Sequence, residues 1–164
     1  MAALAVGQIV VWSGMFYGFS ALLPRWEAAF AQTPGPAPAL GLSLALAVAA
    51  MCAPAAGRAV DRGLGPWLMP AGALAGAAGL ALLSQAQSLW AFHAVWAAMG
   101  AAMACCLYEP CFALLTRARG ADARRAIAAL TLIAGFATLV CFPTVAALES
   151  ALGWRGAMRV MAVG

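Results

Sequence analysis

Residues 57–66 read GRAVDRGLGP, a short charged turn between two long apolar segments. Arg58, Asp61 and Arg62 place three charges there, in a chain with only nine basic and five acidic side chains. A cation at the end of the preceding helix complements the negative end of the helix dipole. Pro66 suits the first turn of the following helix, where its missing N–H is not needed. We therefore predict a tight turn that joins two helices.

Two further features of this turn follow from its residue types. Gly63 and Gly65 are expected to supply the backbone freedom that a short reversal requires. Asp61 is expected to lie near the positive N-terminus of the following helix, and its carboxylate can also accept hydrogen bonds from an arginine.

The apolar segments on both sides of the turn belong to a general excess of apolar residues. Hydrophobic residues make up 66% of the chain and charged residues 9%, against about half and about a quarter in soluble domains. A soluble protein of this size cannot bury so much apolar surface, since polar groups must still cover it. Helices satisfy their own backbone hydrogen bonds in hydrocarbon, so the composition predicts an all-α polytopic membrane protein.

Five apolar segments are long enough to cross a membrane as helices, which takes about 20 residues. We predict these spans at residues 3–24, 40–57, 66–84, 89–115 and 126–148. A sixth apolar segment, residues 154–164, would cover only about 16 Å. It is expected to be the start of a sixth span, cut short at the end of the chain.

The arginines predict the orientation of these spans. With the N-terminus in the cytoplasm, the inner loops hold six arginines, namely Arg58, Arg62, Arg117, Arg119, Arg124 and Arg125. The outer segments then hold the other three, Arg25, Arg155 and Arg159. This distribution obeys the positive-inside rule, and the opposite orientation violates it.

The spacing of residues in the turn is that of a known signature. Gly57, Asp61, Arg62 and Gly65 match the pattern G-x-x-x-D-R-x-x-G, which resembles the motif between the second and third helices of the major facilitator superfamily. The resemblance implies that residues 1–164 are the N-terminal six-helix bundle of a twelve-helix secondary transporter in a bacterial inner membrane. It further implies alternating access for a small solute, with a second six-helix half as partner.

Other segments are similar to patterns of the same family. Residues 96–104 resemble its fourth-helix pattern R-x-x-Q-G-x-G-A-A, with Trp96 in place of the arginine and Met99 in place of the glutamine. Residues 153–155, Gly-Trp-Arg, resemble the start of the sixth helix in bacterial members. Phe142 stands where the antiporter signature G-x-x-x-G-P has glycine, so the mode of coupling stays open.

Two ionisable residues lie inside the fourth predicted span, where such groups are costly and indicate function. His93 shares one helical stripe with Trp96 and Gly100, and the resemblance places the Trp96 position toward the central cavity. We therefore expect these three residues to line a translocation path. The alternative for His93 is a hydrogen bond to a neighbour near the outer interface.

Glu109, the second ionisable residue, lies about 160° around a regular helix from His93. We expect an ion pair with Arg58, Arg62 or Arg117, which would make Glu109 part of a cytoplasmic latch. A proton-binding carboxylate that couples transport is the alternative.

The first predicted span carries a thin polar stripe. Ser13, Tyr17 and Ser20 lie within about 60° of one another on a helix. We expect this stripe to face the cavity, with Tyr17 as its best ligand contact, although hydroxyls bonded to backbone carbonyls would give the same pattern. Gln8 and Trp12 lie on another side and are expected to serve packing or the interface.

The sequence offers no catalytic constellation, cofactor motif or metal-ligand cluster. The five cysteines lie in apolar segments without zinc-type spacing and are expected to be buried small hydrophobes. The arginines form no basic face with interleaved aromatic residues, which argues against nucleic-acid binding. The alternative to a transporter is a non-transporting polytopic membrane protein, such as a membrane-embedded enzyme or an assembly subunit.

Overall fold

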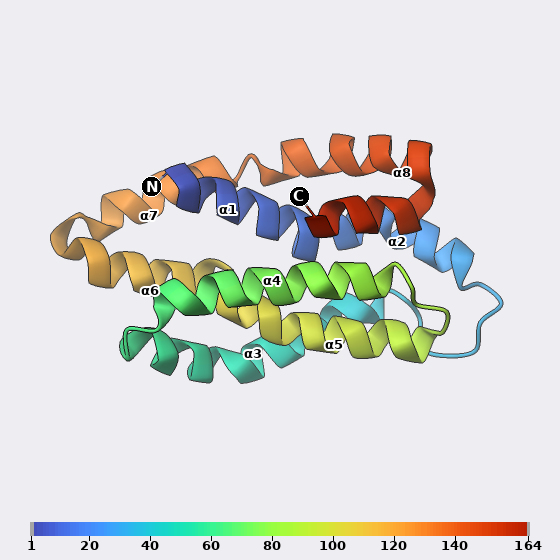
Figure 1. Cartoon of the computed structure of the whole chain (residues 1–164), viewed down its shortest axis with the longest axis horizontal. Coiled ribbons are helices and arrows are strands. Elements are labelled where there is room, and N and C mark those ends of the chain that lie inside the picture. Colours follow the sequence, from blue (N-terminus) through green and yellow to red (C-terminus); the bar gives the residue numbers. More distant parts are fainter. Residues whose placement is uncertain (1, 164) are drawn as a thin grey trace.

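Helices make up the structure, a computed structural model that describes residues 2–163, and no strand occurs in that range. The helices run roughly parallel to one long axis (Figure 1). In chain order they are α1 (Ala2–Trp12), the π-helical η1 (Ser13–Tyr17), α2 (Gly18–Ala29), α3 (Leu40–Asp61), α4 (Gly65–Leu83), α5 (Leu89–Cys106), α6 (Tyr108–Arg119), the 3₁₀-helical η2 (Gly120–Asp122), α7 (Ala123–Ala134) and α8 (Ala137–Val163).

Four stretches within residues 2–163 are long and apolar enough to cross a membrane. They are Ala3–Ala29, Leu40–Asp61, Gly65–Leu83 and Leu89–Val163. This count does not match the five full spans that we predicted. The last stretch is 75 residues long and contains α5 to α8, which follow one another with so few non-helical residues that length and composition alone do not separate them.

Several helices extend beyond the predicted boundaries. The first continues through Pro24 to Ala29, α3 continues to Asp61, and α6 continues through the polar segment to Arg119. Composition marks only where a helix leaves the hydrocarbon, whereas its backbone hydrogen bonds can continue into the polar interface.

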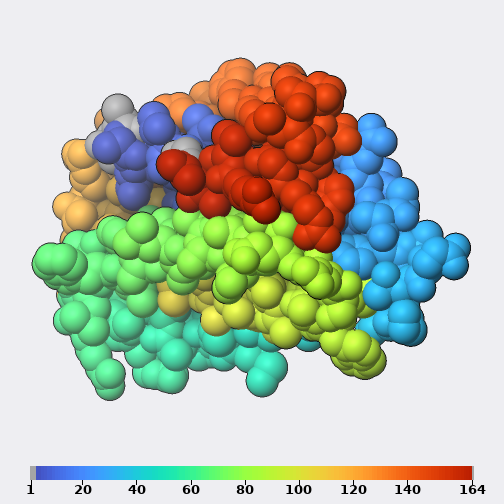
Figure 2. Space-filling model, turned by 45° about the vertical axis from the view of Figure 1, so that its right-hand side comes forward, coloured from blue at the N-terminus to red at the C-terminus, as the bar shows by residue number. Residues whose placement is uncertain are grey.

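The chain reverses direction twice within the last stretch. The first reversal lies at η2, and the second at Gly153, where φ is 68° and the two parts of α8 meet. Figure 2 shows the end of α8, in red, packed against α4, in green.

The core is densest around four aromatic side chains from α2 and α5, which pack mainly edge to face. Phe19 and Trp26 come from α2, and Phe92 and Trp96 come from α5. The ring centroids of Phe19 and Trp96 are 4.8 Å apart, and those of Trp26 and Phe92 are 5.1 Å apart. Such contacts add to the burial of the large apolar rings. This cluster fixes the first span against the fourth.

Candidate functional site

The turn at residues 57–66 forms as expected, and Gly63 is the residue that makes it possible. The N–H of Leu64 bonds to the carbonyl of Ala59, and the N–H of Gly63 bonds to that of Val60. This pair of bonds is a Schellman motif, whose left-handed position is taken by Gly63 at φ 85°. Pro66 lies in the first turn of α4, as predicted.

Gly65 and Asp61 act differently from our expectation. Gly65 has no positive φ, and it leaves room for a neighbour, since a Cβ there would lie 3.1 Å from Cδ1 of Leu114. The side chain of Asp61 does not cap α4, and its carboxylate makes no hydrogen bond within residues 2–163. Instead, Nη1 of Arg117 donates to the backbone carbonyl of Asp61 and holds the turn against α6.

Glu109 lies in the first turn of α6 and forms no ion pair with an arginine in the described chain. The predicted pair with Arg58, Arg62 or Arg117 is therefore absent from this conformation. One reason is that Arg117 is already engaged with the carbonyl of Asp61.

Glu109 instead borders a cavity of about 190 Å³ between the first, second and fourth spans. We call it the Glu109 cavity, and its walls are otherwise apolar or aromatic. Its lining residues are Trp12, Phe16, Leu46, Ala49, Ala50, Ala53, Met103, Ala104, Leu107 and Glu109. Glu109 is exposed, and it borders this mostly apolar space without a cationic partner in the described residues.

The wall formed by Trp12 depends on a break in the fourth span. The helix is interrupted at Leu107, where ψ is −157°. Pro110, four residues after Cys106, has no N–H to give to the carbonyl of Cys106. Nε2 of Gln8 replaces that donor at 2.8 Å, although the two residues lie 98 positions apart. Gln8 is buried, and its Oε1 accepts a bond of 3.2 Å from Nε1 of Trp12.

The first span contributes a second irregularity beside the cavity. Residues Ser13–Tyr17 form a single π-helical turn, and the N–H of Gly18 bonds to the carbonyl of Ser13. Such π-bulges often occur at functional sites. Aromatic rings cluster beside this turn. Trp12 contacts Phe16, Tyr17 and Tyr108, with ring centroids 4.6–5.9 Å apart.

A third interruption separates α7 from α8 at Gly135 and Phe136. This interruption lies next to the π-helical turn, because Oγ of Ser13 donates to the carbonyl of Ala137 and Sγ of Cys141 donates to that of Ser13. The π-helical turn therefore contacts the start of α8, while Gln8 of α1 contacts the break at Leu107.

The structure places His93, Trp96 and Gly100 away from the Glu109 cavity, in tight packing. Trp96 is fully buried, and a Cβ on Gly100 would lie 2.2 Å from the carbonyl oxygen of Ala45. The ring of His93 contacts the carbonyls of Leu89 at 2.7 Å and Ala37 at 3.2 Å. These contacts agree with the hydrogen-bonded alternative for His93. A cavity role for the three residues stays a prediction.

The predicted angle of about 160° between His93 and Glu109 assumed a regular helix. It does not apply, because the helix is broken at Leu107, between the two residues. Ser13 follows the alternative of a hydroxyl bonded to a carbonyl. Tyr17 packs on Trp12 and Phe16, next to the cavity.

Sequence reasoning missed Phe16 and Tyr108 near the site, and it assigned Gln8 and Trp12 only to packing or the interface. One signal for them was present. A proline inside a span leaves a carbonyl without a donor, and a glutamine in another span is a natural replacement. Which glutamine serves depends on packing between distant segments.

Comparisons with family models, with curated proteins and with solved structures found no match for this chain.

Proposed function

We propose that the chain is the N-terminal bundle of a secondary transporter of the major facilitator type, which moves a small solute by alternating access. In this proposal, five full spans and the start of a sixth cross a bacterial inner membrane with the N-terminus in the cytoplasm. A second six-helix half completes the transporter. The proposal assigns no catalytic residue, cofactor or metal.

The observation that carries the proposal is that two interrupted helices border the Glu109 cavity. The first helix contains the π-helical turn at Ser13–Tyr17, and the break at Leu107 separates α5 from α6. Breaks inside hydrocarbon are tolerated where the backbone is buried in protein or lines a cavity. In many transporters, discontinuous helices form the substrate site near the middle of the membrane. A purely structural bundle has no need for two interrupted helices that border one cavity.

The turn at residues 57–66 supports the same function. Gly57 matches the signature, yet a Cβ there would meet no heavy atom within 4 Å. Packing within this bundle therefore does not require a glycine at this position. The open space beside Gly57 fits the close approach of a partner bundle at the cytoplasmic face.

Reading the complete gene is the first test. We expect a second six-helix bundle downstream with a similar charged turn. A soluble catalytic domain in its place would contradict the proposal.

The second test measures motion without needing a substrate. Spin labels are attached at Leu64→Cys, an exposed position in the turn, and in the corresponding turn of the second bundle, with the five native cysteines replaced by alanine. Alternating access predicts two populations of distance by electron paramagnetic resonance. A control pair at Leu64→Cys and Ala121→Cys, within one bundle, should give a single distance. A single distance for both pairs would contradict the proposal.

A further inference from the structure

The carboxylate of Glu109 forms no ion pair within residues 2–163. The one ion pair within 4.0 Å in residues 2–163 joins Arg25 of α2 to Glu149 of α8. Glu109 is exposed and borders the cavity, so a ligand there can reach its carboxylate, and an opposite charge beside a carboxylate is favourable. A cationic ligand in the Glu109 cavity would supply that charge.

The aromatic walls add a second, independent preference for a cation. Trp12 and Phe16 line the cavity, and Tyr17 and Tyr108 pack directly against Trp12. The N–H of Trp12 is already bonded to Gln8, so Trp12 has no free donor for a ligand. Tryptophan is the best aromatic partner for a cation, and quaternary ammonium groups are recognised by aromatic surroundings.

The cavity also limits the size and type of the cation. Its volume of about 190 Å³ lies below the roughly 300–1,000 Å³ of pockets for drug-sized ligands. The alanine side chains of α3, at positions 49, 50 and 53, give alkyl groups an apolar surface. A small ammonium with short apolar substituents fits these walls.

Divalent inorganic cations fit the Glu109 cavity less well. Calcium takes six to eight oxygen ligands and magnesium an octahedral set, whereas residues 2–163 contain no group of three His, Cys, Asp or Glu that could hold a metal ion. A larger cavity of about 320 Å³ lies between α1, α4 and α6, but no charged side chain lines it. The charge therefore singles out the Glu109 cavity.

We propose that the Glu109 cavity binds a small monovalent organic ammonium ion, with Glu109 as its counter-ion and Trp12 and Phe16 as its aromatic wall. Binding of this cation stands on the cavity alone, whereas its role as the transported substrate rests on the proposed function.

The test compares two probes that differ in charge and little else. Choline and 3,3-dimethylbutan-1-ol have nearly the same shape, but the alcohol carries carbon in place of the charged nitrogen. Binding to the complete protein is measured by isothermal titration calorimetry in dodecyl maltoside, a neutral detergent without a choline head group. We expect saturable binding of choline and at least roughly tenfold weaker binding of the alcohol.

Variants locate the site. Glu109→Gln should weaken choline binding roughly tenfold or more, whereas Glu109→Asp, which keeps the charge, should stay within a few-fold of the original. Trp12→Leu should weaken binding roughly three- to thirty-fold. Glu27→Gln makes the same change of charge at an exposed position of α2 outside the cavity lining, so it should bind choline normally. Circular dichroism and size-exclusion chromatography verify that each variant is folded.

Three results would overturn this inference. They are equal binding of choline and the neutral alcohol, unchanged binding in a folded Glu109→Gln variant, and no saturable binding of choline by the folded protein. The transport proposal fails separately. Choline binding without two distance populations would keep the site and remove its transport role, whereas two populations without choline binding would keep the transporter and remove the cation site.

Discussion

Gly57 and Gly100 both lie in apolar helices, but only one of the two positions has room for a side chain. Gly100 lies where α5 crosses α3, so close that a Cβ would stand 2.2 Å from the carbonyl oxygen of Ala45. Gly57, near the end of α3, has open space around the same position. In membranes, small residues let helix backbones approach closely. Of these two glycines, Gly100 is used in this way and Gly57 is not.

Gly100→Ala should therefore destabilise the bundle by about 2 kcal/mol or more, since α3 and α5 must separate to admit the methyl group. Thermal unfolding in detergent, followed by circular dichroism, measures the change.

Gly57→Ala is the matched control. It should leave stability unchanged or raise it by up to about 1 kcal/mol, because alanine favours a helix more than glycine does. Equal losses of stability in the two variants would contradict the packing that we describe.

In the fourth predicted span, a proline is linked to a hydrogen bond between residues that lie far apart in the sequence. Pro110 removes the donor that the carbonyl of Cys106 would have in a regular helix, and Gln8 of α1 replaces it. The same glutamine orients Trp12 through a second bond. The break therefore couples the stability of two spans to the wall of the Glu109 cavity.

A double-mutant cycle should reveal this coupling. Gln8→Leu leaves a buried carbonyl unpaired and should cost about 1–3 kcal/mol. Pro110→Ala restores an N–H to α6, so the added cost of Gln8→Leu in that background should be smaller by about 1 kcal/mol. Unfolding in detergent provides the four free energies.

Gln85→Leu serves as the control for this cycle, because Gln85 is exposed and makes only a long 3.4 Å bond to a carbonyl in its own turn. Its effect should be close to zero with or without Pro110. Strict additivity of Gln8→Leu and Pro110→Ala would show that the proline does not cause the contact.

The two helix interruptions differ in how well the sequence predicts them. An interruption near Pro110 was predictable, since proline cannot continue the hydrogen bonding of a helix. The π-helical turn at Ser13–Tyr17 was not, because no glycine–proline pair or charge marks it. It depends on the packing of Ser13 against Ala137 and Cys141.

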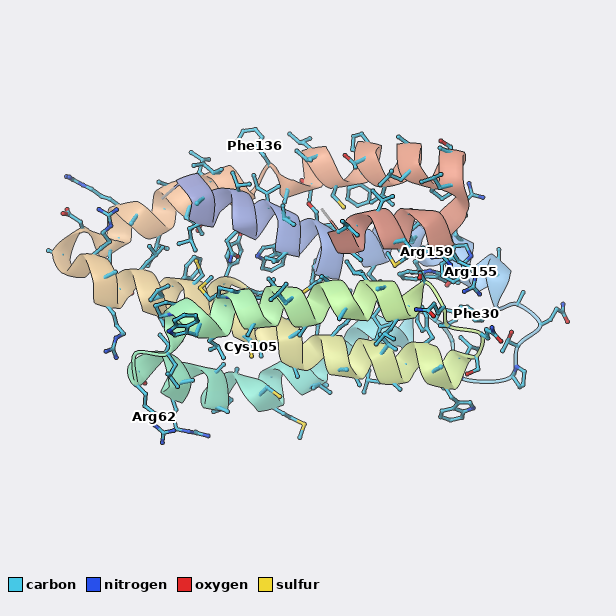
Figure 3. The ribbon with its side chains drawn as sticks, in the orientation of Figure 1. Phe30, Arg62, Cys105, Phe136, Arg155 and Arg159 are labelled. Carbon is cyan, nitrogen blue, oxygen red and sulfur yellow. The ribbon has the colours of Figure 1, made fainter. Side chains whose placement is uncertain are left out.

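At the scale of the whole molecule, the two ends are held differently. One end carries the arginine-rich turns, and Arg117 ties α6 to the turn after α3. At the other end, Arg155 donates to the carbonyls of Ser84 and Ala86 at 2.7 and 2.8 Å, and its guanidinium lies 4.2 Å from the ring centre of Trp154. Figure 3 shows Arg155 and Arg159 together at this end.

Arg155→Ala should lower the free energy of unfolding by about 2 kcal/mol, because two charge-assisted bonds to backbone carbonyls are lost at a partly buried position. The returning part of α8 should then become more accessible. Hydrogen–deuterium exchange of the peptide that covers residues 154–163 measures this, together with the midpoint of thermal unfolding.

Arg159→Ala is the comparison, since its one bond, from Nε to Oγ of Ser84, is long at 3.4 Å. It should lower the midpoint much less than Arg155→Ala does. If both variants exchange like the original protein, these arginines do not hold the end of α8.

The sequence by itself determined that the chain is helical and apolar enough for a membrane, and where the charged turn at residues 57–66 lies. These properties are local, since segment length, composition and turn residues suffice to set them. The tertiary structure decided which residues meet. It took Glu109 out of the expected ion pair, joined Gln8 to Cys106, and moved Trp96 and Gly100 into the packing of α2, α3 and α5. Contacts between distant segments depend on how interrupted helices pack, which no local pattern contains.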